Sequence, residues 1–258
     1  MDLTRVSSAA RSLPPWLVAH RVHRLGLLVD HTLLRPEVTE TDVVRLCDEA
    51  ASLGLGAVCV NGQWLGQVVG WCSSWPGREA QNVRVVSVAG FPLGASGTAA
   101  KVGEIRLAVE AGADEVDAVI SLGWAKAGQW GRVRAEVGAM VEAAGGRPLK
   151  AILETAALAG EEIRRASSAA VEGGARWVKT STGFHPAGGA TLEAVRLMRE
   201  TVGLDVGVKA SGGIRTAEQA VALLLAGADR IGTSSAAGWV SVCRAGPRLG
   251  ELMGGGMT

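Results

Sequence analysis

Two lysines stand out because each follows a short β-branched run that is typical of a strand. Lys179 closes the segment Arg-Trp-Val-Lys, and Lys209 closes Asp-Val-Gly-Val-Lys, 30 positions later. Only five of the 26 basic residues are lysines, and arginine cannot perform amine chemistry. Mutual repulsion and burial lower the pKa of an amine, and the neutral amine forms a Schiff base with a carbonyl. The alternative is that both lysines pair with carboxylates at the rim of the sheet.

An acidic residue lies inside another predicted strand. Asp117 alternates with Val116 and Ala118, which predicts that its side chain faces the interior of the sheet. A buried carboxylate needs a cationic or hydrogen-bonding partner, and the two lysines could supply one. The alternation is equally compatible with a proton shuttle that works through water and with a structural ion pair.

Glycine-rich and hydroxyl-rich turns follow the late strands. Ser211-Gly212-Gly213 follows the seventh, and Gly232-Thr233-Ser234-Ser235 follows the eighth and opens a helix. Backbone N–H groups at such turns bind phosphate in many barrels of parallel strands. Ser181-Thr182-Gly183, after the sixth strand, is a further contributor to the same predicted site.

Other polar residues follow the earlier strands, but each has a plainer interpretation. Asp30-His31-Thr32 and Cys59-Val60-Asn61 are candidates for the same edge, and Cys59 is more typical of a small buried residue. Glu154 and Thr155 follow the fifth strand, where we interpret Glu154 as a supporting or capping residue. The four histidines are scattered and no metal-ligand spacing occurs, so we predict no metal.

The elements that must position these residues alternate between short strands and longer helical segments. Eight strands are expected, at 27–30, 57–60, 83–88, 115–120, 149–153, 176–179, 206–209 and 230–232. Helix-start signals occur at 39–42, 96–98 and 216–218. Eight such units in this length predict an α/β fold, specifically a (β/α)₈ TIM barrel.

We predict a single domain over residues 1–258. Residues 1–14 form a loose leader, residues 250–258 a flexible tail, and an extra N-terminal helix packs on the barrel. That helix would carry one apolar face, made of Trp16, Leu17, Val18, Val22 and Leu25. The eight tryptophans suit either core packing or a subunit contact, which makes a homodimer possible.

Composition excludes several classes of function. The net charge is +1 without a basic block, which argues against nucleic-acid binding. No apolar run reaches the length of a membrane span, and no secretory signal precedes Pro14-Pro15. The four cysteines show no paired spacing, so we expect reduced thiols and a cytoplasmic protein.

Eight motifs taken together resemble the deoxyribose-phosphate aldolase family. They run in the family's order over roughly residues 27–235 and are Asp-His-Thr-Leu-Leu (30–34), Val-Cys-Val-Asn (58–61), Gly-Phe-Pro-Leu-Gly (90–94), Glu-Val-Asp (115–117), Ile-Leu-Glu-Thr (152–155), Val-Lys-Thr-Ser-Thr-Gly-Phe (178–184), Val-Lys-Ala-Ser-Gly-Gly-Ile-Arg-Thr (208–216) and Arg-Ile-Gly-Thr-Ser-Ser (230–235).

The resemblance implies a class I aldolase without metal or organic cofactor. Its substrate would be 2-deoxy-D-ribose 5-phosphate, cleaved reversibly to D-glyceraldehyde 3-phosphate and acetaldehyde. It implies that Lys179 forms the Schiff base, that Lys209 lowers the Lys179 pKa, and that Asp117 manages protons with a water. The residues implied to hold the phosphate are Gly183, Gly212, Gly213, Gly232, Ser234 and Ser235.

The chain departs from the family pattern at several positions. Ser121 replaces the usual asparagine, Gly62 replaces a proline, and Phe184 stands where some members carry a lysine. The sequence contains no tyrosine, although some members use a C-terminal one in proton transfer. Two rivals remain: another Schiff-base aldolase or transaldolase, and a phosphate-binding barrel without catalysis.

Overall fold

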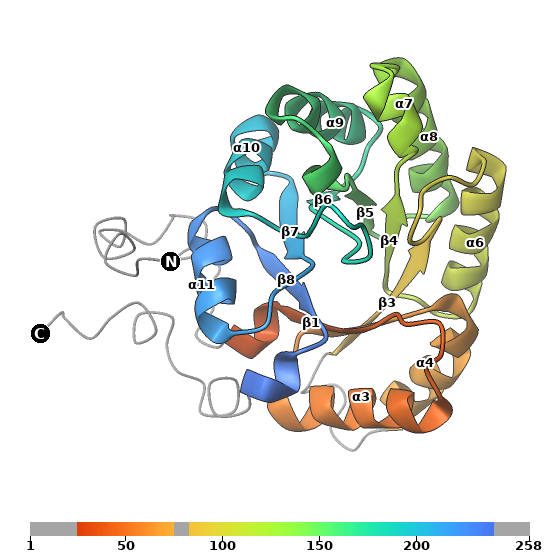
Figure 1. Ribbon diagram of the computed structural model, residues 1–258. Coiled ribbons are helices and arrows are strands. Elements are labelled where there is room, and N and C mark those ends of the chain that lie inside the picture. The colour runs from red at the N-terminus through yellow and green to blue at the C-terminus, as the bar shows by residue number, and fades with distance from the viewer. Residues whose placement is uncertain (1–24, 75–82, 240–258) are drawn as a thin grey trace, which may run out of the picture.

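The structure, a computed structural model, describes residues 25–74 and 83–239. Eight parallel strands close into a barrel in chain order from β1 to β8, which confirms the predicted TIM barrel (Figure 1). The strands are β1 (Val29–Leu33), β2 (Ala57–Val60), β3 (Arg84–Ala89), β4 (Glu115–Val119), β5 (Leu149–Ile152), β6 (Trp177–Lys179), β7 (Gly207–Ser211) and β8 (Arg230–Thr233).

Helices surround the barrel and follow the strands in the chain. The α-helices are α3 (Glu40–Leu53), α4 (Leu65–Ser74), α6 (Thr98–Glu110), α7 (Leu122–Lys126), α8 (Trp130–Ala143), α9 (Gly160–Glu172), α10 (Leu192–Val202) and α11 (Ala217–Leu225). Short 3-10 turns are η2 (Leu25–Leu28), η3 (Gly62–Trp64), η4 (Thr155–Ala157) and η5 (Ala236–Trp239). Two expected helix starts carry full capping boxes, at Thr39 with Asp42 and at Thr216 with Gln219.

All eight expected strands are present, but three lie later than predicted, and β3 is displaced by only one residue. The first was expected at 27–30, whereas residues 25–28 form the 3-10 turn η2 and β1 starts at Val29. The seventh continues to Ser211 instead of ending at Lys209. Asp30 and Lys209 therefore lie within their strands, whereas Lys179 lies at the end of β6.

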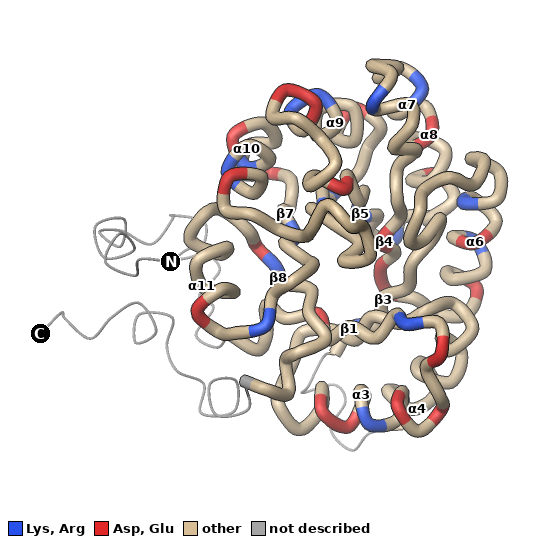
Figure 2. The backbone as a smooth tube through the Cα atoms, in the orientation of Figure 1, with Lys and Arg blue, Asp and Glu red and all other residues tan. Residues whose placement is uncertain are grey.

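The barrel separates apolar side chains from charged ones. Outward-facing strand residues such as Val58 and Val116 pack with helix residues such as Leu46 and Met140 in one large buried cluster. A second, smaller apolar cluster consists of Leu34, Ala57, Cys59, Val86 and Val88. Much of the remaining interior is ionic, and in Figure 2 charged positions lie on strands inside the ring of helices.

A buried ion pair ties the end of β4 to two helices. Nζ of Lys101 on α6 lies 2.8 Å from Oε1 of Glu136 on α8. Glu136 also accepts hydrogen bonds from the N–H and Oγ of Ser121, at 2.7 Å each. Ser121, one of the departures from the family pattern, thus completes a cluster that fixes the chain just after β4.

The expected leader, the apolar helix face and the tail fall almost wholly outside the described residues. Only Leu25 of that helix face is described, and it opens η2. The single-domain organisation stays a prediction. Within residues 25–74 and 83–239, none of the helices is long and apolar enough to cross a membrane.

Gly207 is a position within the barrel strands where an added side chain would overlap its neighbours. A Cβ there would lie 2.2 Å from Cε3 of Trp177, whose ring also stacks under the Arg230 guanidinium at 4.7 Å. We predict that Gly207→Ala lowers the free energy of unfolding by about 1–3 kcal/mol through overpacking. The measurement is urea unfolding followed by circular dichroism.

Gly70 in the exposed face of α4 is the matched control, because nothing lies within 4 Å of a Cβ added there. Gly70→Ala should raise stability by up to about 1 kcal/mol through helix propensity. Equal stability of Gly207→Ala and the parent protein would show that Trp177 is not held in this position.

Candidate active site

Lys179, Lys209 and Asp117 meet inside the barrel, as the sequence predicts. Lys179 and Lys209 are in register on the neighbouring strands β6 and β7. Nζ of each lysine lies 2.8 Å from Oδ2 of Asp117, which comes from β4. All three side chains are at most 3% exposed. A single carboxylate oxygen therefore serves two buried amines at once.

Asp117 also pairs with a third lysine, which the sequence analysis did not select as a site residue. Nζ of Lys150 on β5 lies 2.8 Å from Asp117 Oδ1 and 2.5 Å from Glu115 Oε2. Glu115 in turn pairs with Arg230 at 2.6 Å and with Arg84 at 3.4 Å. Both oxygens of Asp117 are thus occupied by ammonium groups.

The same network reaches β1 on the other side of Lys209. Nζ of Lys209 lies 2.5 Å from Oδ2 of Asp30, whose Oδ1 lies 3.6 Å from Arg230. Five basic and three acidic side chains belong to the network, a formal excess of two positive charges when all are ionised. They are Arg84, Lys150, Lys179, Lys209, Arg230, Asp30, Glu115 and Asp117.

The charge network gives the two central lysines opposite pKa shifts. Burial lowers the pKa of Lys209, but Asp117 and Asp30 outweigh burial, so its pKa is raised and it stays charged. The pKa of Lys179 is lowered, chiefly by burial, with Asp117 opposing and the charge of Lys209 adding to the decrease. Lys209 has two carboxylate partners and Lys179 has one, so Lys179 is the amine that becomes neutral more readily.

The carboxylates of the network stay ionised. Burial raises the pKa of Asp117, but Lys150, Lys179 and Lys209 together hold it well below its usual value. For Asp30, Lys209 leads the charges that outweigh burial and lower the pKa to about 2. At neutral pH both groups therefore accept hydrogen bonds and hold the lysines in place.

The remaining candidates from the first two strands have supporting positions. Nε2 of His31 lies 2.7 Å from Oε2 of Glu49 on α3, and Nδ2 of Asn61 donates to the Leu34 carbonyl at 3.1 Å. Burial and nearby Asp117 raise the pKa of the Cys59 thiol to about 11, so it stays protonated. Its place in the smaller apolar cluster agrees with the interpretation of a small buried residue.

The glycines predicted to bind phosphate follow three neighbouring strands. Gly183 and Gly212 both have positive φ, and a Cβ on Gly183 would lie 3.5 Å from the Gly212 Cα. Gly232 pairs in register with Ser211, the residue before Gly212. Gly213, Ser234 and Ser235 continue the loops after β7 and β8, and Ser234 is exposed. The structure thus brings this set to one side of the barrel mouth, after β6–β8.

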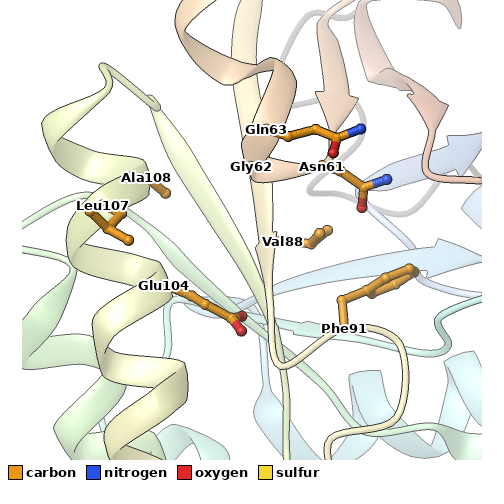
Figure 3. A pocket seen from close by; sticks show the side chains of 8 residues that line it. All are labelled: Asn61, Gly62, Gln63, Val88, Phe91, Glu104, Leu107 and Ala108. Atoms are coloured by element: carbon orange, nitrogen blue, oxygen red, sulfur yellow. The ribbon is translucent and has the colours of Figure 1, made fainter. Parts of the chain in front are cut away.

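A cavity of about 310 Å³ lies between the turn after β2, the end of β3 and helix α6 (Figure 3). Its lining residues are Asn61, Gly62, Gln63, Val88, Phe91, Glu104, Leu107 and Ala108. Val88 is in register with Asp117, and Phe91 packs edge-on against Phe184 with ring centroids 5.3 Å apart. The lining of this cavity is therefore mixed, because the polar side chains of Asn61, Gln63 and Glu104 lie beside apolar ones.

No group of three or more His, Cys, Asp or Glu side chains suited to a metal ion occurs within the described ranges. The expectation of a metal-free site stays a prediction.

Three residues of the charge network were not predicted from the sequence: Lys150, Glu115 and Arg230. The scarcity of lysine would have pointed to Lys150, and strand alternation from Asp117 would have pointed to Glu115.

Comparisons with known proteins agree with this geometry. The family model described as DeoC/LacD family aldolase matches residues 24–244. A Clostridium botulinum protein named deoxyribose-phosphate aldolase is 46% identical over 211 residues, 82% of this chain and 96% of that protein. A protein of the same name from Thermococcus gammatolerans is 49% identical over 209 residues, 80% of this chain and 91% of its own length.

A solved structure shows the same similarity. It is described as a unique tetrameric deoxyribose phosphate aldolase from Aeropyrum pernix, is 32% identical, and has a TM-score of 0.77. The match covers 95% of this chain and 98% of that one. On the extent of the family match and of these identities, the chain belongs to the DeoC/LacD family of aldolases.

Proposed function

We propose that this aldolase reversibly cleaves 2-deoxy-D-ribose 5-phosphate to D-glyceraldehyde 3-phosphate and acetaldehyde through a Schiff base on Lys179. The observation that carries the proposal is the asymmetric lysine pair, in which Lys209 stays charged and the Lys179 pKa is lowered. The relatives' names support the choice of substrate.

The reaction starts at the open-chain aldehyde. Neutral Nζ of Lys179 attacks C1, and the carbinolamine loses water to give an iminium, which is the electron sink for the next step. The C3 hydroxyl gives up its proton to a water held by Asp117 while the C2–C3 bond breaks. D-Glyceraldehyde 3-phosphate leaves, and an enamine remains on Lys179.

The second half of the reaction restores the enzyme. C2 of the enamine takes up a proton, which balances the one lost from the C3 hydroxyl, and water hydrolyses the new iminium to acetaldehyde and free Lys179. Because three lysines hold its pKa low, Asp117 is a weak base. Its role is therefore to orient and polarise the water that moves the proton.

The glycine-rich loops after β6, β7 and β8 are proposed to bind the substrate phosphate. Their contribution is made of backbone N–H groups and hydroxyls, from Gly183, Gly212, Gly213, Gly232, Ser234 and Ser235. With Phe184 in place of a lysine, that loop adds no ammonium group to the phosphate. The positive excess of the barrel network compensates part of the phosphate charge.

Assembly and location stay predictions. The expected homodimer is supported only in that one relative is described as tetrameric, so that a homo-oligomer has precedent. Cys47 and Cys59 are buried thiols outside any disulfide, which is compatible with the expected cytoplasmic location, and Cys243 lies outside the described residues.

Borohydride trapping is the direct test of the Schiff base. We predict that the protein incubated with 2-deoxy-D-ribose 5-phosphate and borohydride gains one reduced adduct, located on the Lys179 peptide by mass spectrometry. Lys179→Arg should abolish the adduct and lower kcat by at least about 1,000-fold, because arginine forms no Schiff base. Lys126→Arg is the matched control, since that lysine pairs with Glu162 at the surface.

The other outcomes of this test favour the rival functions. A folded protein that binds phosphate but traps no adduct would be a binding protein. An adduct on Lys179 without release of acetaldehyde would indicate an aldolase or transaldolase with another donor.

The charge of Lys209 is predicted to set the pH profile of trapping. Lys209→Met removes a positive charge that lowers the Lys179 pKa, so the pKa rises and Lys179 becomes neutral only at higher pH. The rise in trapping rate should therefore move to higher pH, and kcat/KM at pH 7 should fall by about 100-fold. Lys209→Arg keeps the charge and should keep the profile; a profile unchanged in Lys209→Met would contradict this role.

A further inference from the structure

Glu154 has an unusual backbone conformation just after β5. Its φ of 57° makes it the one non-glycine residue with positive φ among those that the structure describes. Such a conformation is rarely adopted by an L-residue with a side chain and persists where the surroundings hold it. The side chain is also buried, with 3% exposure. A strained, buried carboxylate beside an active site suggests a specific task.

The carboxylate of Glu154 is bonded to the loop that follows Lys179. Oε2 accepts a hydrogen bond from Oγ1 of Thr182 at 2.5 Å, and both oxygens lie 3.3 Å from the Thr182 N–H. Oγ1 of Thr182 accepts in turn from the N–H of Phe184 at 3.1 Å. The N–H groups on either side of Gly183 are thereby engaged, and the position of Gly183 between them is fixed.

The rest of this loop is tied to β7. Oγ1 of Thr180 donates to the carbonyl of Ser211 at 3.1 Å and accepts from its N–H at 3.0 Å, while Oγ of Ser211 donates to the Ser181 carbonyl at 2.6 Å. Thr182 has no such link to β7 among the hydrogen bonds of the described residues. Glu154 therefore provides the side-chain anchor at the end of the loop nearest Gly183.

Close packing makes the loop position matter. A Cβ on Gly212 would lie 2.9 Å from the Gly189 Cα and 3.3 Å from the Gly183 Cα, so three glycine backbones are in close contact. A shift of Gly183 by a fraction of an ångström would change this arrangement. Lys179 itself is held separately, by Asp117 and by the pairing of β6 with its neighbours.

We propose that Glu154 is a positioning residue for recognition of the substrate phosphate: through Thr182 it fixes the Gly183 loop, and it takes no part in Schiff-base formation. This proposal rests on the proposed function, because it assigns the phosphate to the loops after β6–β8. The side chain suits the task because its two oxygens accept hydrogen bonds from both the hydroxyl and the N–H of Thr182.

The test compares a phosphorylated substrate with its unphosphorylated counterpart. Glu154→Gly removes the carboxylate and retains a residue that favours positive φ. We expect KM for 2-deoxy-D-ribose 5-phosphate to rise about tenfold or more, with kcat changed less than threefold. Kinetics with 2-deoxy-D-ribose should change less than twofold. An equal loss with both substrates, or no change in KM, would overturn the proposal.

Two further variants separate positioning from general damage. Thr182→Val removes the hydroxyl and should reproduce the rise in KM, whereas Thr182→Ser keeps a hydroxyl and should restore a KM near that of the parent protein. Glu161→Gly removes an exposed carboxylate on α9 and is the surface control for Glu154→Gly. Failure of Thr182→Ser to restore KM would contradict the role of the hydroxyl.

Calorimetry with inorganic phosphate keeps this test independent of the proposed function. The affinity of Glu154→Gly for inorganic phosphate should be about tenfold weaker than that of the parent protein. Equal affinity would overturn the proposal even if the parent protein cleaves 2-deoxy-D-ribose 5-phosphate. If Glu154→Gly bound inorganic phosphate more weakly than the parent protein, but the parent protein proved inactive, the positioning role would be supported and only the proposed reaction rejected.

Discussion

One carboxylate shared by three lysines is the interaction on which the site depends. Asp117 accepts Lys150 on Oδ1 and both Lys179 and Lys209 on Oδ2, each at 2.8 Å. Register brings these groups together, because Asp117 is level with Lys150, and Lys179 with Lys209. A fixed negative charge allows three amines to be buried together, and the second carboxylate, Asp30, favours the charged form of Lys209 over that of Lys179.

Placing charges inside the barrel has a cost that the rest of the fold must offset. Removing one member of a buried ion pair destabilises a protein by about 3–5 kcal/mol, and replacing a whole pair with apolar residues is often neutral. The network is therefore better explained by chemistry than by stability. The apolar cluster between barrel and helices supplies the stability, which leaves the interior free to hold an excess of positive charge.

The sequence allowed much of the fold to be predicted, because strand and helix periodicities alternate eight times. It also placed Lys179, Lys209 and Asp117 together, since the spacing of one strand–helix unit determines neighbouring strands. The contacts of Lys150 could not be predicted, because they depend on strand register, which residue type does not reveal. The positive φ of Glu154 was equally hidden, because tertiary contacts with Thr182 impose it.

Direct titration of the lysines tests the central claim most sharply. The chain has only five lysines, so labelling them with ¹³C and ¹⁵N gives a spectrum that single Lys→Arg variants can assign. The network predicts that the Lys179 amine loses its proton below the ordinary lysine range, while Lys209 remains protonated at higher pH than an ordinary lysine. A Lys179 amine that titrates at or above the ordinary range, or a Lys209 amine that loses its proton first, would contradict the account.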